Sequence, residues 1–447
     1  MHDKVVIVGA GLTGCSTALE LARRGIAVCI VDRFPQPICG ASLRNEGKIH
    51  LGLVYAADES FATAEFQLRG ALTFGPLLDR WLGSESSPRL GLSNPFAYLV
   101  APDSLFTPKK LQRHYVKVNG RFGELCEQFK HLHYLGTRPS EIFLGEQPGK
   151  IESWYPRDAT PTSFMTREVA IDTEALAVLM RTLILREPLV TFHGGHKVEA
   201  IERSPAGFRL QLSTATKKCD LKCETLVNCA WENRLYFDSQ LGLDSPAGHL
   251  FRLKYRLNAY LPAHLRNAPS ATRVLGPYGD IVIRPAGKTF LSWYPEGLQG
   301  WSDEIQPPSS WLPAMSGSLS LDKTREITDR MLAGIAPWFP AAYECPLASV
   351  DAGPIVAWGY NDVDKECSGL HRRDIIGSRH LDGYWSVEPG KLTTAPAVGF
   401  ECAHKISSNF QGADFDNITL SDGLLDSIQR RETSGINPPV TGVADLA

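Results

Sequence analysis

A glycine-rich turn near the start of the chain constrains the fold more than any other feature. Four apolar residues, 5–8, lead directly into Gly9-Ala-Gly11-Leu-Thr-Gly14, which has the spacing G-x-G-x-x-G, and helical spacing of apolar residues follows. This order predicts a strand, a tight turn and a helix whose N-terminus faces a pyrophosphate. Gly9 would allow the turn, Gly11 would let the backbone approach the phosphates, and Gly14 would let helix and strand pack closely.

An acidic residue closes the next apolar run. Residues 26–31 are apolar and end at Asp32, whose carboxylate is placed to accept hydrogen bonds from a ribose diol. The acid favours an unphosphorylated ribose, and hence FAD or NAD over NADP. The turn and the acid together do not choose between FAD and NAD. A purely structural strand–helix–strand unit is the alternative, because a lone G-x-G-x-x-G also occurs in turns that bind nothing.

The composition narrows the class of protein. A chain of 447 residues suggests two domains. The net charge of −3 gives no reason to expect nucleic acid as a partner, and no run of about 18 apolar residues is present to span a bilayer. Because the first strand is predicted to begin by Val5, we expect no signal peptide. Ten scattered cysteines without C-x-x-C pairs predict reduced thiols in a cytoplasmic protein.

Two sequence patterns could suggest a metal site, and neither is convincing. Cys219 and Cys223 lack the second pair that such a site needs, and His131 and His133 have no third ligand nearby in the sequence. We therefore expect no metal.

A loop pattern follows Asp32 and carries the first family resemblance. Residues 40–55 contain three glycines and an Arg-Asn-Glu cluster, which is typical of a loop that touches a ligand. Residues 42–52 resemble the FAD-dependent D-amino-acid-oxidase-like superfamily, in particular its L-2-hydroxyglutarate dehydrogenase branch. The resemblance implies that Ser42, Arg44 and Asn45 bind the FAD phosphates or the ring edge and that His50 lies near the isoalloxazine. The chain departs from this branch at Glu46 and Lys48, where small or apolar residues are usual.

The second half of the chain extends the resemblance. Val198 would line the adenine pocket, and Trp231 stands where the superfamily usually has glycine. The segment Gly390-Lys-Leu-Thr-Thr394 is most similar to the glycerol-3-phosphate dehydrogenase branch, in which a helix begins beneath the flavin pyrimidine ring and its positive end stabilises negative charge on the reduced flavin. The FAD-binding residues that the pattern and the resemblance together predict are Gly9, Gly11, Leu12, Thr13, Gly14, Asp32, Arg33, Ser42, Arg44, Asn45, Val198, Gly390, Lys391, Leu392, Thr393 and Thr394.

Several cations are candidates for binding the substrate. Residues 251–259 alternate, with Arg252, Lys254 and Arg256 on one face, so these cations either hold an anionic substrate or, as we expect, face solvent. Arg284 resembles an arginine that binds a substrate carboxylate in some members of the superfamily, and a structural salt bridge is its alternative. Arg373 resembles a residue of the glycerol-3-phosphate dehydrogenase branch. We take Arg252, Arg256 and Arg373 as substrate-binding candidates.

The fold class that follows is α/β. We expect a Rossmann-like FAD-binding domain and a second, α+β substrate domain built on a mostly antiparallel sheet. The FAD-binding domain would be discontinuous, over residues 1–90, 165–245 and 350–410. The substrate domain would cover 91–164 and 246–349, and residues 411–447 would form a C-terminal tail.

The resemblance implies an FAD-dependent dehydrogenase or oxidase. Its substrate would be a small, anionic 2-hydroxy acid, amino acid or polyol phosphate, which loses hydride to flavin N5 from a C–H bond next to O or N. His50 and Arg284 are the catalytic candidates, because a hydroxyl substrate needs a base and an imidazole titrates near neutrality. The electron acceptor stays open among O2, a quinone and another carrier. The alternatives are a flavin-dependent monooxygenase or halogenase and a non-catalytic flavin-binding subunit.

Overall fold

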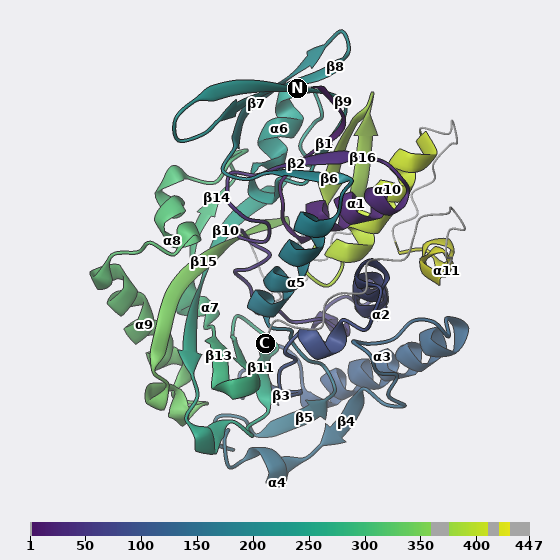
Figure 1. The fold of residues 1–447 in the computed structure, drawn as a ribbon. Coiled ribbons are helices and arrows are strands. Elements are labelled where there is room, and N and C mark those ends of the chain that lie inside the picture. Colours follow the sequence, from purple (N-terminus) through teal and green to yellow (C-terminus); the bar gives the residue numbers. More distant parts are fainter. Residues whose placement is uncertain (1, 359–374, 410–419, 430–447) are drawn as a thin grey trace.

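Two β-sheets with helices packed around them make up the fold (Figure 1). The computed structural model describes residues 2–358, 375–409 and 420–429. Among these residues, no helix is both long enough and apolar enough to span a bilayer. Nor do they contain a group of three or more His, Cys, Asp or Glu side chains placed to hold a metal ion.

The first sheet has a parallel centre in the order β17-β9-β1-β2-β6. Strand β16 extends it antiparallel to β17, and the β7–β8 hairpin is attached through β8 to β9. The strands are β1 (His2–Val8), β2 (Val28–Val31), β6 (Val190–His193), β7 (Lys197–Ser204), β8 (Gly207–Ser213), β9 (Lys218–Asn228), β16 (Gly377–Leu381) and β17 (Tyr384–Glu388). Strand β2 is buried throughout, as expected for a parallel strand that is covered on both faces.

Helices cover this first sheet. Helix α1 packs against α10 and α5, and α10 also contacts α2. The helices of this part are α1 (Leu12–Arg23), α2 (Ala62–Leu82), α5 (Thr173–Arg186), α6 (Arg234–Gln240), α10 (Ala395–Asn409) and α11 (Asp422–Gln429). Asp172 caps α5 by accepting a hydrogen bond from the backbone N–H of Glu174. The start of α1 and the start of α10 both lie beside the cavity described below, because residues just before each helix line it.

The second sheet is mostly antiparallel and has the order β14-β10-β13-β12-β11-β3-β5-β4, with β15 on the other side of β10. Only the β3–β11 pair is parallel among the pairs described. The strands are β3 (Phe96–Val100), β4 (Phe143–Glu146), β5 (Thr162–Thr166), β10 (His249–Tyr260), β11 (Ser270–Val274), β12 (Asp280–Ile283), β13 (Lys288–Leu291), β14 (Leu298–Ser302) and β15 (Leu347–Trp358). The predicted α/β fold class, with a second and mostly antiparallel sheet, is confirmed.

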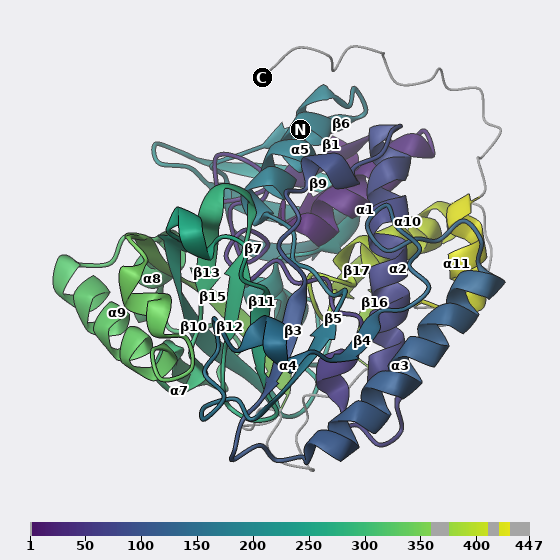
Figure 2. The same ribbon diagram turned by 90° about the horizontal axis from the view of Figure 1, so that it is seen from below.

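Helices at two sides complete this part of the molecule. Figure 2 shows α8 and α9 beside β15 and the long helix α3 beside β4. These helices are α3 (Pro108–Gln128), α4 (Pro148–Ile151), α7 (Tyr294–Gly297), α8 (Leu312–Ser316) and α9 (Leu321–Ile335). Thr107 caps α3 and Pro108 occupies its first position, as the sequence indicates.

The division into domains stays a prediction. The strands of each sheet fall within the segments expected for one domain, with two exceptions. Strand β5, Thr162–Thr166, crosses the expected boundary at residue 165, and strand β15, Leu347–Trp358, crosses the one at residue 350. Part of the second sheet thus belongs to a stretch that we had placed with the first.

Candidate functional site

A cavity of about 470 Å³ is lined by residues of both sheets and contains most of the predicted site. Fifteen of the predicted residues line it: Gly9, Gly11, Leu12, Thr13, Asp32, Arg33, Ser42, Arg44, Asn45, His50, Val198, Arg256, Gly390, Lys391 and Leu392. These come from segments far apart in the sequence, which the fold brings around one space.

The glycine-rich turn forms one end of this cavity. Gly9 has φ +101°, and a Cβ there would lie 2.5 Å from the carbonyl oxygen of Cys229. A Cβ on Gly14 would clash with the carbonyl oxygen of Gly9, so this glycine allows α1 to pack on the turn and does not itself line the cavity. Helix α1 begins at Leu12, directly after Gly11, and its N-terminal end therefore faces the cavity.

Polar residues surround this turn. Asp32 accepts backbone hydrogen bonds from Ala10 at 2.6 Å and Phe34 at 2.8 Å, while burial raises the pKa of its carboxyl group. Ser42 accepts a hydrogen bond from the backbone N–H of Leu12 at 2.9 Å. Arg33 pairs with Glu232 at 2.5 Å. Asp32 is thus fixed in orientation beside the glycine-rich turn, and each of its oxygens retains a lone pair toward the cavity.

The loop after residue 40 is held in place by hydrogen bonds from its own side chains and by contacts with the second sheet. Asn45 donates to the carbonyl oxygens of Ala41 and Ser42 and accepts from the backbone N–H of Gly47. Arg44 donates to the carbonyl oxygen of Cys39 and lies 3.7 Å from Asp351 of β15. These contacts hold the loop so that Glu46, Lys48 and His50 line the cavity.

His50 occupies the other end of the cavity. Its backbone N–H donates to Thr393 Oγ1 at 3.0 Å, and its side chain is 8% exposed. Its Nδ1 atom has no hydrogen-bond partner among the residues that the structure describes. Burial, together with Lys391 and Lys48, lowers the pKa of His50 well below its usual value. The imidazole is therefore neutral at physiological pH, and the residue lines the cavity.

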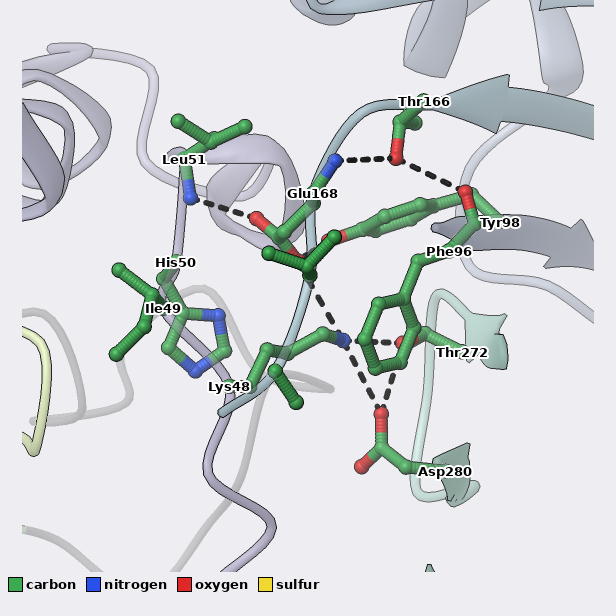
Figure 3. Close-up of polar contacts among 12 residues, drawn as sticks. Lys48, Ile49, His50, Leu51, Phe96, Tyr98, Thr166, Glu168, Thr272 and Asp280 are labelled. Atoms are coloured by element: carbon green, nitrogen blue, oxygen red, sulfur yellow. Dashed lines mark hydrogen bonds and ion pairs between the residues drawn. The ribbon is translucent and has the colours of Figure 1, made fainter. Parts of the chain in front are cut away.

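A buried ionic cluster lies next to His50 (Figure 3). Lys48 Nζ is 3.2 Å from Asp280 and 3.6 Å from Glu168, and it donates to Thr272. Glu168 also accepts hydrogen bonds from the backbone N–H of Leu51 and from the Tyr98 hydroxyl, both at 2.6 Å. The cluster therefore holds the chain on both sides of His50 to the second sheet. Sequence reasoning missed Glu168 and Asp280, since each is distant in sequence from the loop.

A second charged pair lies within the cavity itself. Glu46 Oε2 is 3.7 Å from Lys254 Nζ, which donates to the Tyr294 hydroxyl at 3.1 Å. All three residues line the cavity. The sequence marked Glu46 as a departure from the family pattern and Lys254 as part of a cationic strand, but nothing in it placed the two together.

The segment before α10 lies close to His50. Gly390, Lys391 and Leu392 line the cavity, whereas Thr393 and Thr394 are buried behind it. Glu388 accepts a hydrogen bond from the backbone N–H of Gly390 at 3.0 Å and pairs with buried Arg234 at 2.7 Å. Helix α10 begins at Ala395, so its positive end is directed at the same region as His50.

The comparisons with known proteins decide the family. A model described as "DAO: FAD dependent oxidoreductase" matches residues 4–404. The chain belongs to this family. The predicted recognition is confirmed, as are FAD as the cofactor and the class of FAD-dependent oxidoreductase.

Individual proteins match this FAD-dependent oxidoreductase either over a short stretch or with low sequence identity. It is 41% identical over 49 residues to a D-amino acid dehydrogenase of Rhizobium johnstonii, a match that covers 11% of this chain and 12% of the relative. Among solved structures, iminodiacetate oxidase from Chelativorans sp. BNC1 has TM-score 0.63 and 16% identity, over 92% of this chain and 96% of that one. L-α-glycerophosphate oxidase from Mycoplasma pneumoniae has TM-score 0.60 and 16% identity, over 91% and 95%. These likenesses support the fold.

The cavity fits the family's cofactor. At one end the glycine-rich turn, Asp32 and Val198 line the space where the ADP part would lie, and a Cβ at Gly9 would disturb this turn by its clash with Cys229. At the other end His50 Nδ1 lacks a partner among the described residues, and the start of α10 faces the same space. Trp231 keeps a left-handed backbone, with φ +46°, where the family usually has glycine, and its indole N–H donates to the carbonyl oxygen of Pro354. The tryptophan is thus accommodated at the cavity wall.

The cationic strand requires a correction. We expected the face of β10 that bears Arg252, Lys254 and Arg256 to be solvated, but these residues are only 2%, 9% and 8% exposed. The prediction is wrong because the loop over residues 43–46 lies against Lys254 and Arg256 on this face. Lys254 and Arg256 reach the cavity, whereas Arg252 is buried away from it.

Two arginines that we predicted to act on the substrate have other partners. Arg256 forms a bidentate pair with Asp351, at 2.5 and 3.0 Å, and donates to the carbonyl oxygens of Leu43 and Asn45. Arg284 donates to the carbonyl oxygens of Ile171 and Glu46 and does not line the cavity. Both guanidinium groups hold backbone, so neither enters the function proposed below. Arg373 lies outside the described residues.

Proposed function

We propose that this protein oxidises a C–H bond next to oxygen or nitrogen in a small anionic substrate, namely a 2-hydroxy acid, an amino acid or a polyol phosphate. FAD, when bound, supplies the hydride acceptor at flavin N5. The observation that carries the proposal is a neutral, buried histidine that lines the same cavity as several lysines, Lys254 and Lys391 among them.

Each of these residues has a task in the proposed chemistry. For a hydroxyl substrate, the His50 imidazole takes the O–H proton as hydride leaves the carbon, which converts the alcohol into a carbonyl group. An amine that enters neutral needs no such base. The ammonium groups of Lys254 and Lys391 attract an anionic substrate into the cavity. The ion cluster of Lys48, Glu168 and Asp280 keeps the main chain at His50 in place.

The test is anaerobic mixing of the purified, FAD-loaded protein with amino acids, 2-hydroxy acids and polyol phosphates. We expect members of one class to bleach the flavin absorbance. Admission of air afterwards identifies the acceptor, since rapid return of colour with peroxide formation indicates O2. Bleaching by NAD(P)H alone would contradict the proposal and favour a monooxygenase.

The role of His50 is tested by His50→Ala. If the substrate is a hydroxyl compound, we expect flavin reduction to slow by about 10²–10⁴-fold, the usual contribution of a general base. His264→Ala is the matched control, because this side chain is 66% exposed and lies outside the cavity lining. Reduction of His50→Ala by a hydroxy acid at the wild-type rate would show that His50 is not the base.

A further inference from the structure

A pair of opposite charges within the cavity is not explained by the proton transfer described above. Glu46 belongs to the loop that leaves the first sheet, and Lys254 lies on β10 of the second sheet. Their charged atoms are 3.7 Å apart, which is an ion-pair distance but too long for a direct hydrogen bond. The Glu46 side chain is 23% exposed and the Lys254 side chain 9% exposed, and both line the cavity.

Both groups carry their charge at physiological pH. Burial disfavours ionisation of Glu46, but Lys254 and the other neighbouring positive groups outweigh it and lower the carboxyl pKa to about 2. Burial likewise disfavours the Lys254 ammonium, yet Glu46 and Tyr294 raise its pKa above the usual value. The cavity therefore presents a fixed negative and a fixed positive charge side by side.

This pair is not needed to hold the loop. The main chain of Glu46 is held through its carbonyl oxygen by Arg284, at 2.6 Å, and the preceding residues are held by Arg256. Burying two charges costs several kcal/mol per ion, and apolar residues of similar volume often pack as stably. A loop fixed by backbone contacts would be equally well served by the small or apolar residue that the resembling branch has at position 46.

We propose that Glu46 and Lys254 form a binding subsite for a zwitterion, so that the substrate class is an amino acid. This inference rests on the proposed function and narrows it. Lys254, aligned by its hydrogen bond to Tyr294, would bind the carboxylate of the substrate, and Glu46 would bind the ammonium group. In an α-amino acid one carbon separates these two groups, which matches the close spacing of Glu46 and Lys254.

The other two substrate classes fit this pair less well. A 2-hydroxy acid satisfies Lys254 but places a neutral hydroxyl group against a charged carboxylate. A polyol phosphate brings a dianion next to Glu46, and like charges at this distance repel. His50 lines the same cavity and is influenced by both charges, so its neutral imidazole would take a proton from the bound ammonium group before hydride leaves the α-carbon.

Binding can be separated from turnover with probes that have no hydrogen on the α-carbon. We would titrate the oxidised, FAD-loaded protein with 2-aminoisobutyrate, 2-hydroxyisobutyrate and inorganic phosphate, and follow the flavin spectrum. We expect 2-aminoisobutyrate to bind at least about tenfold more tightly than 2-hydroxyisobutyrate, because a charge-assisted hydrogen bond is lost with the latter. Glu46→Gln should remove this preference, whereas Lys254→Met should weaken both carboxylates.

Matched measurements keep the outcome clear. Glu127→Gln, an exposed change on α3, is the control, and the FAD content of every variant is measured first. Equal binding of the two organic probes, binding of neither, or an equal effect of Glu46→Gln on both overturns the inference. The inference is also overturned if Glu46→Gln changes the flavin spectrum equally in the presence and in the absence of the probe, since Glu46 would then act on the flavin itself. Flavin bleaching by hydroxy acids alone would contradict the zwitterion subsite but agree with the proposed function. If none of the substrates bleaches the flavin, the proposed function itself is contradicted.

Discussion

At the scale of single residues, the sequence located His50 but could not describe its environment. The resemblance of the loop placed a histidine near the flavin, and the structure places His50 in the cavity with Nδ1 unpartnered among the described residues. Its charge state depends on Lys391, which is more than 300 residues away in the chain. The same is true of Glu46, whose partner Lys254 comes from another sheet. Pairings of this kind follow from the tertiary fold, and local patterns do not reveal them.

The depressed pKa of His50 predicts the pH dependence of turnover. A base is active above its pKa and is lost as pH falls through it, so kcat/KM for a hydroxyl substrate should show no His50-linked fall as pH decreases through 6.5. Lys391→Met removes a cation that disfavours the imidazolium, so the acid limb of the profile should move to higher pH. Lys130→Met, at a side chain that is 66% exposed, is the control. An acid limb that stays in place in Lys391→Met would contradict this electrostatic account.

At the scale of elements, the glycine-rich turn was the most predictable part of the molecule. Its strand, turn and helix appear as β1, residues 9–11 and α1, because the same glycines are required both locally and for packing. The face of β10 was predicted wrongly because alternation along a strand shows which residues share a face but not what covers that face. Arg284 was likewise read as a substrate ligand although it holds backbone.

Substitution of Gly14 tests whether FAD binding requires the close packing of α1 on the glycine-rich turn. In Gly14→Ala the new Cβ would clash with the carbonyl oxygen of Gly9, so we expect loss of bound FAD and a lower melting temperature. Gly120→Ala in α3 is a matched change, since no atom lies within 4 Å of the new Cβ, and it should stabilise the protein by about 0.5–1 kcal/mol. The ratio of flavin to protein absorbance after purification measures the first effect. Normal FAD content in Gly14→Ala would show that the turn tolerates a side chain.

The buried cluster beneath His50 should make a large contribution to stability. Lys48→Met leaves Glu168 and Asp280 buried without their cation, and we expect the free energy of unfolding to fall by about 3–5 kcal/mol. Lys197→Met removes one member of an exposed pair with Glu199 and should cost at most about 1 kcal/mol. Urea denaturation of both variants makes the comparison. Similar losses in the two variants would mean that the cluster contributes no more than a surface pair.

At the scale of the whole molecule, the segments of the chain that build each sheet agree in outline with the segments predicted from the sequence. The cavity that would hold FAD is lined by residues from distant stretches, 9–50 and 390–392, and the family pattern predicted that both stretches bind the cofactor. Strand β15 crosses the predicted boundary near residue 350, because a twelve-residue strand paired along β10 has no local signal that marks which sheet it joins. The substrate end of the cavity was the least predictable region, since it is formed where the two sheets meet.

Cofactor removal tests how the whole molecule depends on the cavity. Because FAD would contact residues from both sheets, its addition to protein stripped of flavin should raise the melting temperature, with a stabilisation of about 2.7 kcal/mol at a concentration 100 times Kd. FMN lacks the adenosine half that Asp32 and Val198 would bind, so it should stabilise far less. Thermal melts across a concentration series of each flavin make the measurement. Equal stabilisation by FMN would place the cofactor away from the glycine-rich turn.

The clamp formed by Arg256 has a consequence for how the cavity opens. This side chain joins β10 to β15 and to the loop of the first sheet through four hydrogen bonds, two of them to a carboxylate. A hinge motion that separated the sheets at this point would have to break the bonds to the loop, each worth about 1.5–3 kcal/mol when the donor is charged. We therefore expect the two sheets to stay joined at this point when substrate enters the cavity.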